Sequence, residues 1–168
     1  RADAPVMPAV KYRSMMNASD AIIWHIEQDP LLQSTIMAIW ELEAEPTPDR
    51  MRESAIRMMT SIERLHQRVE AARPRPRWVD VVDIHIDDHF STHSLGGRAT
   101  MTDALAFAEQ WVREPFDRSR PLWEFYVIEG LQTAPGAPPG ARHIAFYGKV
   151  HHASLDGAGG IVLANAML

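Results

Sequence analysis

Apolar residues recur with two different periods along this chain, which predicts a mixture of strands and helices. Between residues 35 and 42 they fall on alternate positions, as in a half-buried strand. From Met51 to Val69 they are three or four residues apart, which predicts one long amphipathic helix. Thr47 and Pro48 suit the N-cap and first position of that helix.

Similar reasoning predicts the other elements. A short helix is expected over residues 16–25, with Ser14 or Asn17 at its start, and a strand from Trp78 to Phe90. Thr100 and Asp103 form a capping pair for a second long helix. Its expected apolar face consists of Met101, Leu105, Ala108 and Val112, with Phe107 and Trp111 alongside.

Two further strands of opposite direction are predicted towards the C-terminal end. They run from Leu122 to Ile128 and from His143 to Val150, and the proline- and glycine-rich stretch 134–140 joins them as an exposed loop. Residues 157–168 resemble the beginning of another helix. The pattern therefore indicates an α/β fold, a two-layer sandwich with a mixed sheet, and it contains neither GxGxxG nor a Walker loop.

Composition narrows the class of protein. A length of 168 residues suits one domain, and 46% hydrophobic with 23% charged residues is typical of a globular chain. A net charge of −5 argues against a broad nucleic-acid-binding face. The sequence has no cysteine, which excludes disulfides, thiolate zinc sites and a cysteine nucleophile, and no apolar run approaches the roughly 20 residues that span a bilayer. We expect a cytoplasmic protein, with peripheral contact to a membrane or lipid droplet left open.

The most informative segment follows the last predicted strand and reads His151-His152-Ala153-Ser154-Leu155-Asp156-Gly157. A neutral imidazole can take a proton from an alcohol or amine as that group attacks a thioester. The aspartate can hold the turn through local hydrogen bonds, and the glycine lets the backbone bend into the next helix. The segment thus favours base-assisted acyl transfer.

These seven residues match the HHxxxDG signature shared by chloramphenicol acetyltransferase and the peptide-synthetase condensation domains. The stretch 115–124, with Pro121-Leu122-Trp123-Glu124 at its end, resembles the bacterial wax ester synthase/diacylglycerol acyltransferase branch of that group. Ser19-Asp20 and residues 86–89 resemble further family segments. Two departures are an opening that lacks the usual Leu-Ser-Pro and a histidine, His85, where the family usually has an acid.

The resemblance implies a role for each motif residue. His152 would be the general base, while His151 would be structural and, by strand alternation, point to the opposite side. Asp156 would turn away from substrate and pair with an arginine, and Gly157 would allow close approach at the helix start. Pro121, Leu122 and Trp123 are expected to pack, with Trp123 anchoring the strand beside the active-site strand.

The resemblance also implies an acyl-CoA-dependent O-acyltransferase that esterifies a long-chain alcohol or diacylglycerol to wax ester or triacylglycerol. Acyl-CoA would be a co-substrate, and no cofactor, metal or nucleic acid is expected. Residues 1–168 would form an N-terminal subdomain, one half of a chloramphenicol-acetyltransferase-like fold, with the C-terminal half of the protein completing the substrate tunnel. The alternatives are a condensation-type acyltransferase using a carrier-protein thioester and a non-catalytic scaffold that retains the fold.

Two other clusters allow two interpretations each. Arg73, Arg75 and Arg77 could meet the phosphates of coenzyme A, or could belong to a solvated, stiff turn. His85, His89 and His93 are four residues apart, a spacing that would align metal ligands on a helix. Because the surrounding residues favour a strand, which would scatter the three rings, we assign no metal site.

Overall fold

The structure is a computed structural model and describes residues 13–29, 31–44 and 47–155. Its centre is a four-stranded sheet in the order β2 (Thr35–Ala44), β7 (Arg142–His151), β6 (Trp123–Leu131) and β5 (Phe90–Ala99). β7 is antiparallel to both of its neighbours, whereas β5 and β6 are parallel. The predicted α/β class, the mixed sheet and the opposite directions of β6 and β7 are confirmed.

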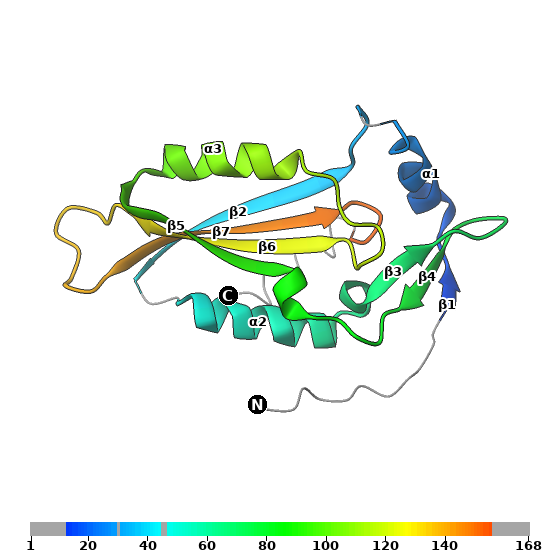
Figure 1. The fold of residues 1–168 in the computed structure, drawn as a ribbon, viewed down its shortest axis with the longest axis horizontal. Helices are drawn as coiled ribbons and strands as arrows, with labels where there is room; N and C mark the ends of the chain where they lie inside the picture. Colours follow the sequence, from blue (N-terminus) through cyan, green and yellow to red (C-terminus); the bar gives the residue numbers. More distant parts are fainter. Residues whose placement is uncertain (1–12, 30, 45–46, 156–168) are drawn as a thin grey trace.

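One long helix covers each face of this sheet, α2 (Pro48–Ser61) below and α3 (Met101–Val112) above in Figure 1. Met51, Ala55 and Met58 of α2 pack against aromatic residues on one face of β6 and β7. Ala104, Ala108 and Trp111 of α3 pack on the other face. The described part of the chain thus has three layers where the sequence pattern predicted two.

A smaller antiparallel sheet lies to one side, in the order β1 (Arg13–Met15), β4 (Arg77–Asp80) and β3 (Gln67–Glu70). The short helix α1 (Ala18–Ile26) lies beside it (Figure 1). Ala21 of α1 shares a buried cluster with Trp78 of β4 and Val69 of β3. The side chain of Ile22, on the same helix, is exposed.

The predicted helix starts are confirmed. Asn17 caps α1 and Thr47 caps α2, with Pro48 in the first helical turn. Thr100 and Asp103 form a complete capping box on α3. The buried face of α3 differs from the expected one, because Leu105 is 45% exposed while Ala104 is fully buried.

The helix predicted up to Val69 is wrong beyond Ser61. Ile62 adopts an extended backbone, residues 63–66 form a 3-10 turn (η1, Glu63–His66), and Val69 belongs to β3. The hydroxyls of Thr60 and Ser61 both donate to the carbonyl oxygen of Arg57, an interaction that competes with further helix. Most of the apolar positions are nevertheless buried, with Met51, Ala55, Met58 and Leu65 in the cluster against the sheet and Ile62 half-buried beside them. Val69 is buried in the separate cluster that contains Trp78.

The strand predicted from Trp78 to Phe90 is also wrong. β4 ends at Asp80, a second 3-10 turn spans η2 (Ile86–Asp88), and the long strand β5 begins only at Phe90. β5 is polar over most of its length because it lies at an edge of the sheet, and its pairing with β6 is irregular between Ser94 and Ala99. Hydrophobic alternation therefore does not reveal it.

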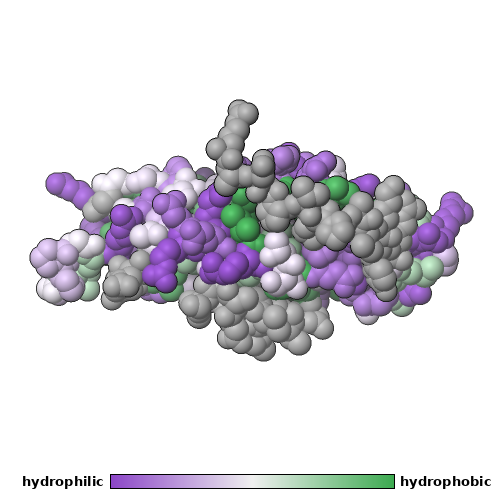
Figure 2. All heavy atoms as spheres, turned by 90° about the horizontal axis from the view of Figure 1, so that it is seen from below, coloured by the Kyte–Doolittle hydropathy of each residue, from purple (hydrophilic) through white to green (hydrophobic). Residues whose placement is uncertain are grey.

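Where described residues are visible from the α2 side, they are mostly hydrophilic, with a small hydrophobic area near the centre of the view (Figure 2). Within the described residues, no helix is long and apolar enough to cross a membrane.

Candidate active site

The two histidines of the motif lie where β7 ends. Alternation along β7 sends Phe146 and Val150 to the α2 face of the sheet and Tyr147 to the α3 face. His151 is 1% exposed, and its backbone N–H donates to the carbonyl oxygen of Leu122 at 3.0 Å. His152 follows in a turn and is exposed, and its backbone N–H donates to the carbonyl oxygen of Ser34 at 2.8 Å. One ring is therefore enclosed and the other is open to solvent.

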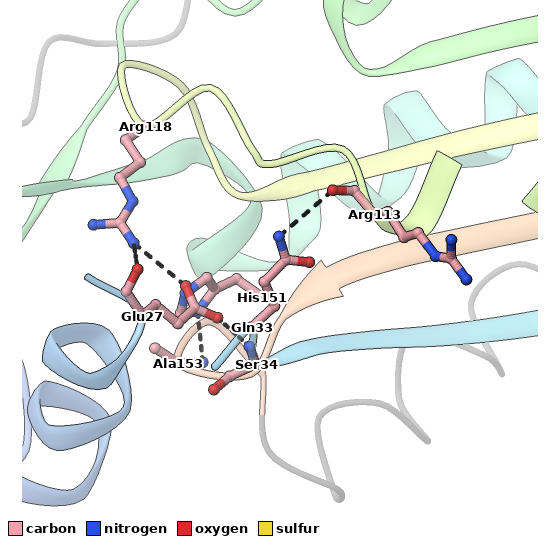
Figure 3. Close-up of polar contacts among 7 residues, drawn as sticks. All are labelled: Glu27, Gln33, Ser34, Arg113, Arg118, His151 and Ala153. Carbon is pink, nitrogen blue, oxygen red and sulfur yellow. Dashed lines mark hydrogen bonds and ion pairs between the residues drawn. The ribbon is translucent and has the colours of Figure 1, made fainter. Parts of the chain in front are cut away.

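Both nitrogen atoms of the His151 ring have partners. The backbone N–H of Ala153 donates to Nδ1 at 3.0 Å, and Nε2 lies 2.5 Å from a carboxylate oxygen of Glu27 (Figure 3). Because Nδ1 accepts, a neutral ring must carry its proton on Nε2 and donate it to Glu27. Trp24 and Phe116 flank the ring, with centroids 5.5 and 6.2 Å away.

Burial lowers the pKa of His151 from its usual value, against the opposing attraction of the Glu27 carboxylate. The imidazole is therefore neutral near pH 7. The ring is thus held in one tautomer by its two partners, and the structural role expected for His151 stays a prediction.

Glu27 connects this histidine to two other segments. Its second carboxylate oxygen accepts a hydrogen bond from the backbone N–H of Ser34, at the entrance to β2. Arg118 lies 3.4 Å from the carboxylate, and its guanidinium stacks 4.2 Å above the Trp24 ring. Figure 3 shows Glu27, Arg118 and His151 converging from the end of α1, from the segment before β6 and from the end of β7.

A cavity of about 370 Å³ opens beside this network. Its lining combines apolar side chains with amide, hydroxyl, carboxylate and guanidinium groups. The lining residues are Glu27, Gln28, Gln33, Thr35, Pro115, Phe116, Arg118, Leu122 and His151. The cavity thus gives the buried histidine a mixed polar and apolar surrounding that reaches solvent.

Leu122 and Trp123 are each 1% exposed, and Pro121 is also buried. The indole N–H of Trp123 donates to the carbonyl oxygen of Leu65 at 2.8 Å, and the ring stacks on His89 at 4.4 Å. These contacts fit the packing role expected for Pro121-Leu122-Trp123. Through its carbonyl, Leu122 also fixes the backbone of His151.

A buried lysine lies near the site and was not identified from the sequence. Lys149, two residues before His151 on β7, is fully buried, and its ammonium donates to the carbonyl oxygen of Glu114 at 2.8 Å. It also forms an ion pair with Glu124 at 3.2 Å and lies 4.6 Å from the Phe116 ring centroid. The only sequence signal was a lysine within an otherwise apolar strand.

The remaining candidates do not join this cluster. His89 is buried, and this burial lowers the pKa of its imidazole. Its Nδ1–H donates to the carbonyl oxygen of Trp123. His93 stacks on the ring of Phe107. Among the described residues no three potential ligands are grouped around a metal site. The arginines at 73, 75 and 77 belong to the smaller sheet and its β3–β4 connection, whereas the His151 network is built from other segments. Asp156, Gly157 and the helix predicted after them lie outside the described residues.

The fold of this chain is shared with proteins of known structure. Its fold is that of the condensation domains: the starter condensation domain of rhizomide synthetase superposes with a TM-score of 0.72 at 16% identity, covering 93% of this chain and 38% of that one. The wax ester synthase/diacylglycerol acyltransferase of Marinobacter aquaeolei superposes with a TM-score of 0.66 at 23% identity, covering 90% of this chain and 37% of that one. The expected likeness to the chloramphenicol-acetyltransferase-like fold is confirmed.

The chain belongs to the wax ester synthase/diacylglycerol acyltransferase family, whose catalytic-domain model matches residues 16–168. A putative diacylglycerol O-acyltransferase of Mycobacterium tuberculosis is 32% identical over 145 residues, which is 84% of this chain and 28% of that protein. A probable diacylglycerol O-acyltransferase of the same species is 25% identical over 157 residues, 90% of this chain and 55% of that protein. The chain thus spans about a quarter to a half of the length of these relatives.

Proposed function

We propose that the protein carrying these residues is an acyl-CoA-dependent O-acyltransferase and that His152 is its general base. The observation that carries the proposal is the arrangement at the end of β7. A buried, hydrogen-bonded His151 supports an adjacent, solvent-facing His152 in a chain of the wax ester synthase/diacylglycerol acyltransferase family.

In the proposed step His152 removes the proton from the acceptor hydroxyl as its oxygen attacks the carbonyl carbon of the acyl thioester. The new carbon–oxygen bond forms first, and the carbon–sulfur bond then breaks as the tetrahedral intermediate collapses. The imidazolium returns its proton to the departing thiolate, so that ester, free thiol and neutral histidine result.

The proposed substrates are a fatty acyl-CoA and a long-chain alcohol or diacylglycerol. The relatives named as a diacylglycerol O-acyltransferase and as a wax ester synthase/diacylglycerol acyltransferase support the acceptor class. A structure of the rhizomide synthetase condensation domain in complex with C8-CoA supports a coenzyme A thioester as the acyl donor. Since the relatives are longer than this chain, we further propose that residues beyond it cover the exposed face of His152 and complete the substrate tunnel.

A thiol-release assay on the natural protein tests this proposal. Long-chain acyl-CoA is mixed with a fatty alcohol or diacylglycerol, and the wild type is compared with His152→Ala and with His85→Ala, an exposed histidine outside the network. We expect acceptor-dependent release that falls by about 10²- to 10⁴-fold in His152→Ala, or about 3–5 kcal/mol of barrier, and is unchanged in His85→Ala. Undiminished release in His152→Ala would refute the base assignment.

The fold likeness to a condensation domain favours one alternative substrate, a carrier-protein thioester. The same assay with an acylated carrier protein separates the two donors. Faster transfer from the carrier than from free acyl-CoA would replace our proposal with the condensation-type reaction. No release from either donor by a folded protein would favour a scaffold.

A further inference from the structure

Glu27 is the least expected member of the cluster, because it lies outside the motif and 124 residues away from its partner His151. Its side chain is only 9% exposed. A largely buried carboxylate is costly unless donors surround it, and three donors do so here. They are Nε2–H of His151, the backbone N–H of Ser34 and the Arg118 guanidinium.

The hydrogen bonds around His151 are compatible with only one neutral form of the ring. A ring with its proton on Nδ1 would direct that N–H against the backbone N–H of Ala153 and leave Nε2 without a donor at Glu27. The carboxylate can only accept, so it selects the Nε2–H form. Glu27 therefore fixes both the tautomer and the orientation of His151.

Glu27 reaches His152 by a second route. Ser34 donates its backbone N–H to Glu27 and accepts the backbone N–H of His152 at its carbonyl oxygen. Ser34, directly before β2, thus connects the Glu27 carboxylate to the backbone of His152. Loss of the carboxylate would loosen both neighbours of the His152 backbone, namely Ser34 and His151.

We propose that Glu27, supported by Arg118, is a positioning residue that holds His152 for acyl transfer by fixing His151 and Ser34. This inference rests on the function proposed above. Glu27 itself touches no reacting atom, and its effect on His152 is exerted through His151 and Ser34. Arg118 has a lesser part, because it lies 3.4 Å from the carboxylate and its side chain is 43% exposed.

The principal test variant is Glu27→Gln in the natural protein. The amide has nearly the size of the carboxylate but has one accepting oxygen and a donating NH2, so it cannot accept from both His151 and Ser34. We expect kcat to fall by roughly 10- to 100-fold with KM nearly unchanged, as for a catalytic group displaced by a fraction of an ångström. Glu27→Asp, which keeps two acceptors, should restore part of the loss. Glu109→Gln, in an exposed pair with Arg113, is the matched control and should leave kcat unchanged.

The ratio of ester formed to acyl-CoA hydrolysed separates positioning from simple loss of folded protein. Unfolding lowers both products in proportion, whereas a misplaced base should reduce esterification more than hydrolysis. If Glu27→Gln unfolds, Arg118→Met provides the second test, with an expected fall in kcat of a few-fold and the same change in ratio. Wild-type kcat in either folded variant, or a loss with an unchanged ratio, would overturn the inference.

The same series distinguishes this failure from that of the proposed function. Full activity in His152→Ala would refute both. A large loss in His152→Ala together with wild-type behaviour of Glu27→Gln would leave the general base in place and remove only the role of Glu27.

Discussion

Replacing Lys149 by methionine tests the energetics of the sheet that carries the site. The substitution keeps the aliphatic stem but removes the ammonium, its hydrogen bond to the carbonyl oxygen of Glu114 and its ion pair with Glu124. Breaking a buried ion pair from one side costs about 3–5 kcal/mol. The Glu124 side chain is 25% exposed and keeps the indole N–H of Trp111, so we expect the lower end, about 3 kcal/mol.

Urea unfolding of the wild type and Lys149→Met, followed by fluorescence, measures this difference from the midpoints at constant slope. Arg113→Met is the control, because its exposed pair with Glu109 contributes at most about 0.5 kcal/mol. Adding Glu124→Gln to Lys149→Met should recover part of the loss by removing the unpaired carboxylate. A Lys149→Met protein within about 1 kcal/mol of the wild type would refute the reasoning.

Two further predictions concern stability. In Gly148→Ala the new Cβ would lie 3.3 Å from ring atoms of Phe125 and Trp40. The cost of this overpacking, about 1–3 kcal/mol, should exceed the smaller gain from reduced backbone entropy of the unfolded chain. A variant more stable than the wild type in urea would contradict this. Burial lowers the pKa values of His89 and His151 from the usual value of about 6.5. Below that pH the unfolded chain therefore binds more protons than the folded chain. The free energy of unfolding should decline as pH falls from about 6.5. Urea midpoints at a series of pH values measure the decline, and His89→Gln should make it shallower; an unchanged slope would show that His89 does not contribute.

Local signals in the sequence are sufficient to predict where the helices start and where the two inner strands, β6 and β7, lie. A cap such as Thr100 with Asp103 acts within four residues, and β6 and β7 are apolar because both of their faces are covered. The same reasoning failed for Val69 and for β5. The apolar residues up to Val69 are three or four positions apart. This spacing fits one continuous helix, and it fits equally well a helix followed by a turn and a strand. At β5 the edge position permits polar residues, so the strand leaves little hydrophobic pattern.

The motif histidines could be found from the sequence because they are adjacent to each other and follow a strand. Glu27 and Arg118 could not, since their relation to His151 exists only after α1 and the segment before β6 have packed against the end of β7. A glutamate at the end of a short helix otherwise reads as an ordinary surface residue. The tautomer of His151 likewise depends on a long-range partner.

The position of β7 within the sheet also bears on how the protein is made. β7 is nearly the last described segment of the chain, yet it lies between β2 and β6, and Thr35 pairs with His151 across more than a hundred residues of sequence. During synthesis on the ribosome β2 and β6 therefore emerge with unpaired edges that attract other strands until β7 arrives. Closing so long a loop makes folding slow. The strand that completes the sheet also ends at His151 and leads directly into His152, so the nascent chain acquires its fold and its candidate active site in the same late step.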